Sequence, residues 1–423
     1  MNCVKSLLIV SKPTNLSHLL WVLFLSLANF AFHSNAGETN SAFTVACYYF
    51  PDYHPGDPRN DKNKGKGWSE WDLVKAARPR FLDEHQPNVP LWGYGDESRP
   101  EIMAKKIEAA ANNGINVFIF DWYYYQDGPF LQGCLDDGFL KATNVNRCKF
   151  ALMWANHDWL DLHPYKLGTP QKLLYPGKVT PEQFDQICDY IIHNYFMRPS
   201  YWRIDGKPYF SFYELSKLLE NFGSVPATRA ALDRFRARAV AAGLPGIHLN
   251  AVIWGRPILP DEKTPVDSAK LIHDLGFDSV TDYVWIHHVS LDEQQTDYNH
   301  VRDAYFQYWD QAEKKYGVPY FPNVTMGWDP SPRCDQSDKF GNFGYPFTNT
   351  IKNNTPENFR TALEMAKQHL LFETNCPHIL DINCWNEWTE GSYLEPDTVH
   401  RMAYLKAVKS VFASPEESGN SLH

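Results

Sequence analysis

The chain has 423 residues, and its 40 Lys+Arg against 50 Asp+Glu leave a formal net charge of −10 at pH 7. A net acidic protein is a poor partner for nucleic acid or an anionic membrane, so we expect neither as a ligand. Tryptophan (14) and tyrosine (23) are plentiful, and their rings stack on sugars as well as building ordinary cores. The composition therefore leans toward a carbohydrate ligand.

The first residues have the pattern of a secretory signal. Lys5 and Lys12 precede an uncharged apolar run at 19–32, and Ser34-Asn35-Ala36 has the small-x-small form of a cleavage site. We expect residues 1–36 to be removed and the mature protein to be secreted or periplasmic, with a retained N-terminal anchor as the alternative. No later stretch has the length of a membrane span, so we expect no membrane contact after cleavage.

Cysteine spacing carries less information. Of the eight cysteines, Cys3 lies in the signal, which leaves an odd number and at least one free thiol. Cys134 and Cys148 flank a turn-rich segment, and we expect them to form a disulfide. No CxxC pair or His/Cys cluster suggests zinc, and no Gly-rich turn suggests a nucleotide, so we predict no metal and no cofactor.

Strand-like and helix-like segments alternate along the rest of the chain. The predicted strands are 43–50, 115–120, 149–154, 207–213, 247–254, 279–285, 320–325 and the segment from His378. The predicted helices are 99–112, 181–197 (with Thr180 as N-cap), 227–242, 268–275, 298–316, 356–373 and 399–412. Eight strands alternating with helices predict an α/β fold, a (β/α)₈ TIM barrel with long βα loops over residues 37–413, followed by a polar tail at 414–423.

In such a barrel every strand ends at the same face, where active sites are built. Nearly every predicted strand ends in an aromatic residue beside a polar one, which suits a sugar cleft. The candidate substrate-binding residues are Tyr49, His54, Trp68, Glu70, Asp121, Trp122, Tyr123, Trp154, Asn156, His157, Tyr213, Trp254, Tyr283, Trp328, Asp329, Asn386, Trp388 and Tyr393. For any single aromatic, a role in roofing the barrel is an equally good interpretation.

The eighth strand runs directly into Trp385-Asn386-Glu387-Trp388-Thr389-Glu390-Gly391. Two carboxylic acids held close together beside indole rings should differ in pKa, because burial and mutual repulsion raise one of them. Glu387 and Glu390 would then provide one acid and one base, which is the equipment for cleaving a glycosidic bond. The alternative is a solvated acidic loop above two core tryptophans.

This stretch resembles the Trp-Asn-Glu-Trp-x-Glu-Gly signature of glycoside hydrolase family 99, the endo-α-mannosidases. Its continuation through Tyr393-Leu394-Glu395-Pro396 is closer to the WbsX-like branch of that superfamily. Three further segments agree with that branch: Tyr49-Phe50-Pro51-x-x-His54 with Gly67-Trp68-Ser69-Glu70-Trp71, then Trp154-Ala155-Asn156, and Gly327-Trp328-Asp329-x-x-Pro332-Arg333. Thr389 stands where the endo-mannosidases typically have His, and His157 where the WbsX-like pattern usually has Glu.

The resemblance implies a (β/α)₈ barrel and metal-free, retaining hydrolysis of an α-linked glycan. It implies that Glu387, as the base, removes the proton from the sugar 2-hydroxyl, whose oxygen attacks C1 to form a 1,2-anhydro sugar. It implies that Glu390, as the acid, protonates the leaving oxygen.

We therefore predict an exported glycoside hydrolase that acts as a monomer on an oligosaccharide or polysaccharide. The alternatives are a glycosyltransferase of polysaccharide assembly and a non-catalytic carbohydrate-binding barrel. The signal disfavours transfer because nucleotide-sugar donors are cytoplasmic, and the intact acid pair disfavours a non-catalytic barrel. We also expect Arg333 to form a structural ion pair with Asp329 beneath the loop after the seventh strand.

Overall fold

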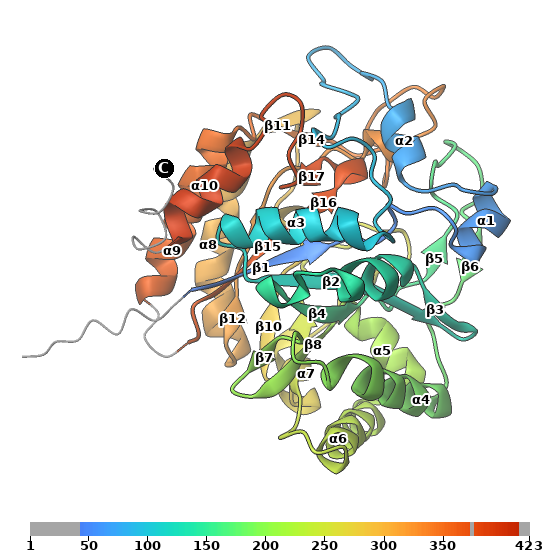
Figure 1. Ribbon diagram of the computed structural model, residues 1–423, viewed down its shortest axis with the longest axis vertical. Coiled ribbons are helices and arrows are strands. Elements are labelled where there is room, and N and C mark those ends of the chain that lie inside the picture. Colours follow the sequence, from blue (N-terminus) through green and yellow to red (C-terminus); the bar gives the residue numbers. More distant parts are fainter. Residues whose placement is uncertain (1–42, 373–375, 414–423) are drawn as a thin grey trace, which may run out of the picture. The chain divides into compact units, whose positions relative to one another are not determined.

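A ring of parallel strands forms the centre of the computed structural model, which describes residues 43–372 and 376–413 (Figure 1). The expected signal peptide and polar tail lie outside the described residues. In chain order the ring contains β1 (Thr44–Tyr49), β2 (Val117–Tyr125), β4 (Lys149–Trp154), β8 (Lys207–Phe212), β9 (His248–Val252), β10 (Ser279–Thr281), β12 (Tyr320–Phe321) with β13 (Asn323–Thr325), and β15 (Ile379–Asn383). β1 pairs with β15, Val45 opposite Leu380, so the predicted first and eighth strands are neighbours. The predicted (β/α)₈ barrel is confirmed.

The ring closes at Pro322, which divides the predicted seventh strand in two. β12 pairs with β10, and β13 pairs with β15. Proline has no backbone N–H and cannot donate to a ladder, so the chain changes partners at this residue. The Pro322 carbonyl still accepts from Asp381 N at 2.9 Å. The prediction of one continuous strand at 320–325 was wrong in this detail.

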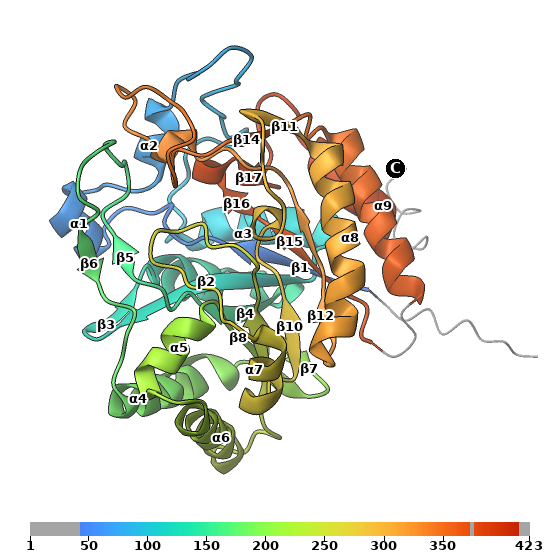
Figure 2. The same cartoon turned by 180° about the vertical axis from the view of Figure 1, so that it is seen from behind.

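Helices cover the outside of the ring (Figures 1 and 2). The predicted helices correspond to α3 (Pro100–Asn112), α4 (Pro181–Ile191), α6 (Val225–Ala241), α7 (Ser268–Leu275), α8 (Tyr298–Tyr316), α9 (Pro356–Phe372) and α10 (Ala403–Phe412). Thr180 caps α4 in a capping box with Gln183, as two hydrogen bonds of 2.9 and 3.2 Å show. Three helices were not predicted: α1 (Pro58–Lys64), α2 (Trp71–Ala76) and α5 (Leu215–Phe222).

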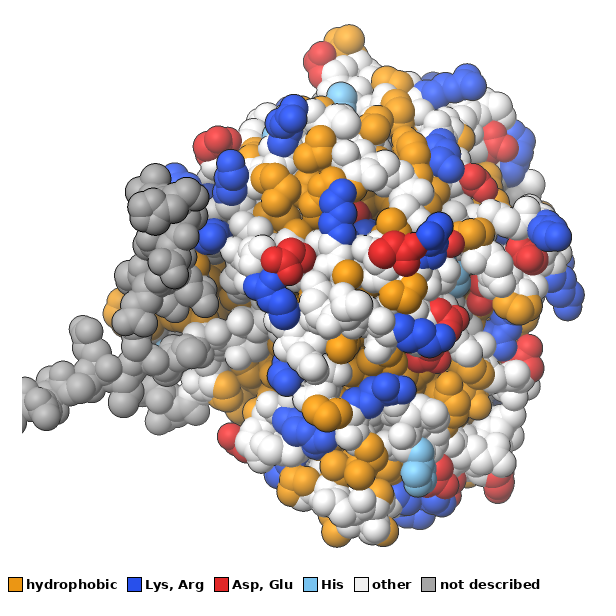
Figure 3. Space-filling view, in the orientation of Figure 1, with side chains coloured by type: hydrophobic (Ala, Val, Ile, Leu, Met, Phe, Trp, Pro, Cys, Tyr) orange, Lys and Arg blue, Asp and Glu red, His pale blue; other side chains and the backbone are white. Residues whose placement is uncertain are grey.

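Short strands occupy the connecting segments: β3 (Gly128–Phe130), β5 (Trp159–Leu160), β6 (Leu173–Tyr175), β7 (Arg203–Ile204), β11 (Gln295–Asp297), β14 (Thr350–Lys352), β16 (Asn386–Glu387) and β17 (Ser392–Tyr393). β7 and β8 form an antiparallel hairpin around Asp205-Gly206. The space-filling view shows acidic and basic side chains interspersed over the visible face (Figure 3), so the net negative charge is not concentrated there.

The expected disulfide is absent, and that prediction was wrong. Cys134 and Cys148 are both free and buried. Cys134 Sγ lies 3.5 Å from a carboxylate oxygen of Glu97, in a polar cluster outside β1. Among the helices of residues 43–372 and 376–413, none combines the length and apolar character that crossing a bilayer requires.

Candidate active site

The acid pair lies on a tight turn at the end of β15. β16 and β17 form a small antiparallel ladder with Glu387 opposite Ser392, and Trp388–Glu390 forms the turn between them. Gly391 closes the turn at φ 66°, and a Cβ there would come within 2.9 Å of the Asp329 side chain. A residue other than glycine would be strained and obstructed at this position. The turn therefore holds Glu387 and Glu390 on a rigid support.

Arg333 joins the two acids. Its Nη2 donates to Glu387 Oε1 at 2.6 Å, and its Nη1 donates to Glu390 Oε1 at 2.5 Å. Tyr345 OH also donates to Glu390 Oε1 at 2.8 Å, whereas Glu387 Oε2 has no hydrogen-bond partner. The side chains of Arg333 and Glu387 are 5% and 2% exposed, so these charges interact in a medium that screens them poorly.

A third carboxylate completes the cluster around the guanidinium. Glu70 Oε2 lies 3.5 Å from Arg333 Nε, and Glu70 Oε1 lies 3.5 Å from His163 Nδ1. The Phe50 ring lies 5.2 Å from the guanidinium carbon. The expected pairing of Arg333 with Asp329 was wrong, since the carboxylate of Asp329 accepts from Gln86 Nε2 and Ser331 N.

The two acids differ in their electrostatic surroundings. Burial raises the pKa of Glu387 well above its usual value and that of Glu390 less strongly, and Arg333 opposes the shift at both. Glu390 accepts two hydrogen bonds that favour its ionised form, while Glu387 accepts one. Burial therefore raises the pKa of Glu387 more than that of Glu390.

These acids line a cavity at the mouth of the barrel, the central pocket, of about 90 Å³. A cavity of this size has room for several waters. Of the predicted residues, those that line it are Asp121, Tyr123, His157, Tyr213, Tyr283, Trp328, Glu387 and Glu390. Asp121 accepts from Tyr283 OH at 2.9 Å, and its other oxygen is buried without a partner.

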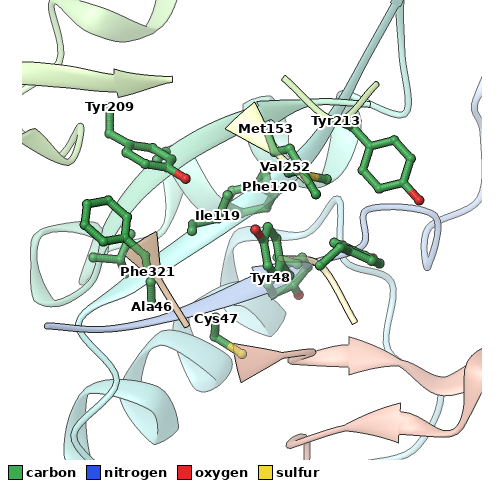
Figure 4. Packing of buried hydrophobic residues seen from close by; sticks show 14 of the residues in the cluster. Ala46, Cys47, Tyr48, Ile119, Phe120, Met153, Tyr209, Tyr213, Val252 and Phe321 are labelled. Carbon is green, nitrogen blue, oxygen red and sulfur yellow. The ribbon is translucent and has the colours of Figure 1, made fainter. Parts of the chain in front are cut away.

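Strand alternation excludes three of the predicted aromatics from the pocket. Tyr49, Trp122 and Trp154 point outward to the helices, and each follows or precedes an inward-pointing residue. Tyr49 OH donates to Met103 Sδ of α3, and Trp154 packs on Phe184 of α4. Figure 4 shows the same alternation in β1, where Tyr48 and Cys47 lie on opposite sides of the strand.

Two predicted amides hold the loops rather than line the pocket. The Asn156 side chain exchanges two hydrogen bonds of 2.8 Å with the backbone of Glu214. The Asn386 side chain does the same with Phe50, at 2.9 and 2.7 Å. Both amides therefore connect the ends of neighbouring segments.

The other predicted residues also lie outside the central pocket. Trp388 stacks on Tyr393, with centroids 3.9 Å apart, and Trp254 packs behind Tyr213. His54 lies 3.2 Å from the Pro55 carbonyl.

A second hollow, of about 570 Å³, lies beyond Trp328, which lines both cavities. The remaining predicted residues are Trp68, near Lys64; Glu70, described above; and Asp329 and Tyr393, which line this second hollow.

Sequence reasoning missed several residues of the pocket, chiefly Arg333, Tyr345, Glu262 and the aliphatic residues Leu160, Leu162, Ile258 and Leu259. Arg333 belongs to a segment that carries the family resemblance, which was the available signal. Tyr345 and Glu262 lie in loops without a comparable pattern. Within the described residues, no group of three or more His, Cys, Asp or Glu side chains is placed to hold a metal ion.

A buried ion-pair network supports the acid turn from behind. Lys106 of α3 pairs with Glu97 and, at 2.9 Å, with Glu395. Asn386 Nδ2 donates to Glu97 at 3.2 Å, and Trp388 Nε1 donates to Glu395 at 3.1 Å. Lys106 thus pairs with two carboxylates that orient the residues on either side of Glu387.

Replacing Lys106 with Met should lower the free energy of unfolding by about 3–5 kcal/mol, because it leaves buried carboxylates unpaired. Chemical denaturation measures this loss. The adjacent Lys105 is exposed and lies over the Trp92 ring, so Lys105→Met should cost less than about 1 kcal/mol. Equal stability of the two variants would contradict a supporting role for the network.

Comparison with known proteins gives a consistent picture. A family model described as "Glycosyltransferase WbsX" matches residues 45–408. Two proteins described as "Uncharacterized protein WxcX", from Xanthomonas campestris pv. campestris strains B100 and ATCC 33913, are each 26% identical to the chain, over 91% and 86% of its length. The matches cover 52% and 49% of those proteins, so the chain spans about half the length of the curated relatives it matches.

Two solved structures share the fold. The GH99 endo-α-mannosidase of Bacteroides thetaiotaomicron, in complex with Bis-Tris propane, has a TM-score of 0.52 and 14% identity, covering 87% of this chain and 95% of that one. A protein described as "Glycoside hydrolase-like protein" has a TM-score of 0.53 and 16% identity, covering 89% and 95%. At these identities the likeness shows the (β/α)₈ fold alone.

Proposed function

The chain belongs to the family described as glycosyltransferase WbsX, and we propose that it is an exported, retaining glycoside hydrolase that cleaves an α-linked glycan. The observation that carries the proposal is the pair Glu387 and Glu390, buried in one pocket and joined by Arg333. Export rests on the expected signal at residues 1–36.

In the proposed reaction, Glu387 accepts the proton of the sugar 2-hydroxyl while that oxygen bonds to C1. The glycosidic bond breaks, and Glu390 gives its proton to the leaving oxygen. In the second half, Glu390 takes a proton from water, the water oxygen bonds to C1, and the C1–O2 bond breaks. The 2-oxygen recovers its proton from Glu387, so both acids return to their starting states and the anomeric configuration is retained.

The proposed roles require the proton on Glu390, whereas burial raises the pKa of Glu387 more strongly. Substrate binding resolves this difference. Glu387 Oε2 is buried without a partner, and a 2-hydroxyl that donates to it would stabilise the ionised form and lower its pKa. In this proposal Glu390, the more exposed acid at 9% against 2%, then carries the proton.

Glycosyl transfer is the alternative that the family name suggests. The charges in the central pocket disfavour it, since six carboxylates line the pocket and Arg333 is the single Lys or Arg among its lining residues. That guanidinium is already paired with three glutamates. The diphosphate of a nucleotide sugar would meet repulsion there.

We expect purified protein to release reducing ends from an α-linked oligosaccharide or polysaccharide in water alone. A panel of such glycans, followed by NMR of the first-formed anomer, tests both hydrolysis and retention. Glu387→Gln protein serves as the blank. Product formation that required a nucleotide-sugar donor would favour transfer instead.

A further inference from the structure

Glu70 directly precedes α2 and lies at the edge of the acid cluster. Its backbone N–H donates to the Asp52 carbonyl at 3.0 Å, and its own carbonyl accepts from Leu73 N at 3.1 Å. The next residue, Trp71, packs on Trp388 of the acid turn, with ring centroids 6.0 Å apart. These contacts fix the position of Glu70 beside the proposed acid and base.

The Glu70 carboxylate is buried without a hydrogen bond. The residue is 0% exposed, and among the described residues neither of its carboxylate oxygens has a hydrogen-bond partner. Arg333 Nε and His163 Nδ1 each lie 3.5 Å from one of these oxygens. Because a buried charge is costly unless it is paired, Glu70 depends on the guanidinium of Arg333 for its stabilisation.

The guanidinium is shared. Within the described part of the chain, this one cation pairs with three carboxylates, those of Glu70, Glu387 and Glu390. Burial, followed by the repulsion of Arg333, lowers the pKa of His163 well below its usual value, so that ring adds no positive charge at neutral pH. Each carboxylate that shares the guanidinium therefore weakens its hold on the other two.

The other titratable neighbours of Glu70 do not offset its charge. Asp52 Oδ1 accepts from Asn60 Nδ2 at 2.6 Å, and Asp52 Oδ2 is buried without a partner among the described residues. Burial, followed by the repulsion of Glu70, raises the pKa of Asp52 well above its usual value. Burial likewise raises the pKa of Tyr53. Neither side chain supplies a positive charge.

We propose that Glu70 is a positioning residue that draws part of the Arg333 charge away from the acid pair, so that the pair keeps a proton for catalysis. Glu70 is not among the residues that line the central pocket, so it acts through the guanidinium and not on the sugar. Burial is the main cause of the raised pKa of Glu387 and Glu390, Arg333 opposes it, and the Glu70 carboxylate adds to it at both acids. This role rests on the proposed function, which needs one protonated and one ionised acid.

Titration of the acids themselves tests the proposal without turnover. Full-length protein is isotope-labelled at the glutamate side-chain carboxyl carbon, and NMR signals of the pair are assigned from the Glu387→Gln and Glu390→Gln proteins. In Glu70→Gln protein the apparent titration midpoints of the pair should fall, by roughly one pH unit for the larger shift, because Arg333 then pairs with two carboxylates only. Glu364→Gln, at an exposed ion pair of α9, should leave both midpoints unchanged.

A second variant and an activity measurement complete the test. Glu70→Ser removes the same charge and leaves space for water, so it should shift the midpoints in the same direction. Both limbs of the pH profile of kcat/KM should also move to lower pH, because the base then ionises, and the acid loses its proton, at lower pH. Circular dichroism confirms folding.

Unchanged or raised midpoints in a folded variant, or loss of folding in both variants, would overturn the proposal. Lowered midpoints without hydrolysis by wild-type protein would instead contradict the proposed function and leave the effect of Glu70 on the acid pair standing.

Discussion

Replacing either Glu387 or Glu390 with Gln should lower kcat/KM on the natural glycan by ~10²–10⁴, the usual effect of losing general acid or base help. Glutamine keeps the size and hydrogen-bonding capacity of the side chain but removes the titratable group. Steady-state kinetics measure the loss, and circular dichroism confirms folding. Glu364→Gln, on the exposed face of α9, is the matched control and should retain wild-type activity.

The two variants should separate on an activated substrate. An aryl glycoside with a good leaving group needs little protonation, so Glu390→Gln should recover much of its rate there and Glu387→Gln should not. Rescue of Glu387→Gln alone would exchange the two roles. Wild-type rates for both variants would remove the acid pair from the mechanism.

The 2-hydroxyl provides an independent check on the anhydro route. A 2-deoxy substrate lacks the oxygen that is proposed to attack C1, so wild-type enzyme should not turn it over. Normal turnover would indicate direct attack by a carboxylate or by water, with the acid pair retained.

Loss of Arg333 should shift the pH dependence as well as the rate. The guanidinium lowers the pKa of both acids, so Arg333→Gln should raise both. Because the proposed base must be ionised, the acid limb of kcat/KM should move to higher pH. The loss should be greatest at low pH, where the base of the variant is protonated and that of the wild-type protein is still partly ionised, and should shrink as pH rises.

The conservative variant distinguishes charge from geometry. Arg333→Lys keeps the positive charge but loses the planar fork that reaches both acids, so it should recover part of the shift. Arg360→Gln, at an exposed ion pair on α9, should leave the profile unchanged. An unaltered acid limb in folded Arg333→Gln would show that this residue does not set the ionisation of the pair.

Local pattern was enough to predict the barrel and to select the acids. Strand and helix periods depend on neighbouring residues alone, so β1, β15 and the helix that Thr180 caps follow from the sequence. Parallel strands in a barrel end at one face, and this rule by itself assigns Asp121, Tyr283 and the acid turn to the same end of the barrel.

The side of each strand on which a residue lies was decided by the tertiary structure. Asp121 and Trp122 are adjacent in a strand that is apolar on both faces, so the sequence carries no alternation to distinguish them. Packing directs Asp121 into the barrel, where Tyr283 donates to it, and Trp122 toward Tyr195. In the same way, packing places Tyr48 on the inner side of β1 and Tyr49 on the outer side, toward the helices.

The position of Arg333 also depended on the complete fold. It lies on the loop between β13 and β14, 54 residues before Glu387, and its chain neighbour Asp329 was the local partner that sequence suggested. A loop is placed by the surfaces it packs against rather than by its own periodicity. The sequence by itself therefore determined the barrel and its acid pair, whereas only the closed barrel brought Arg333 between the two acids.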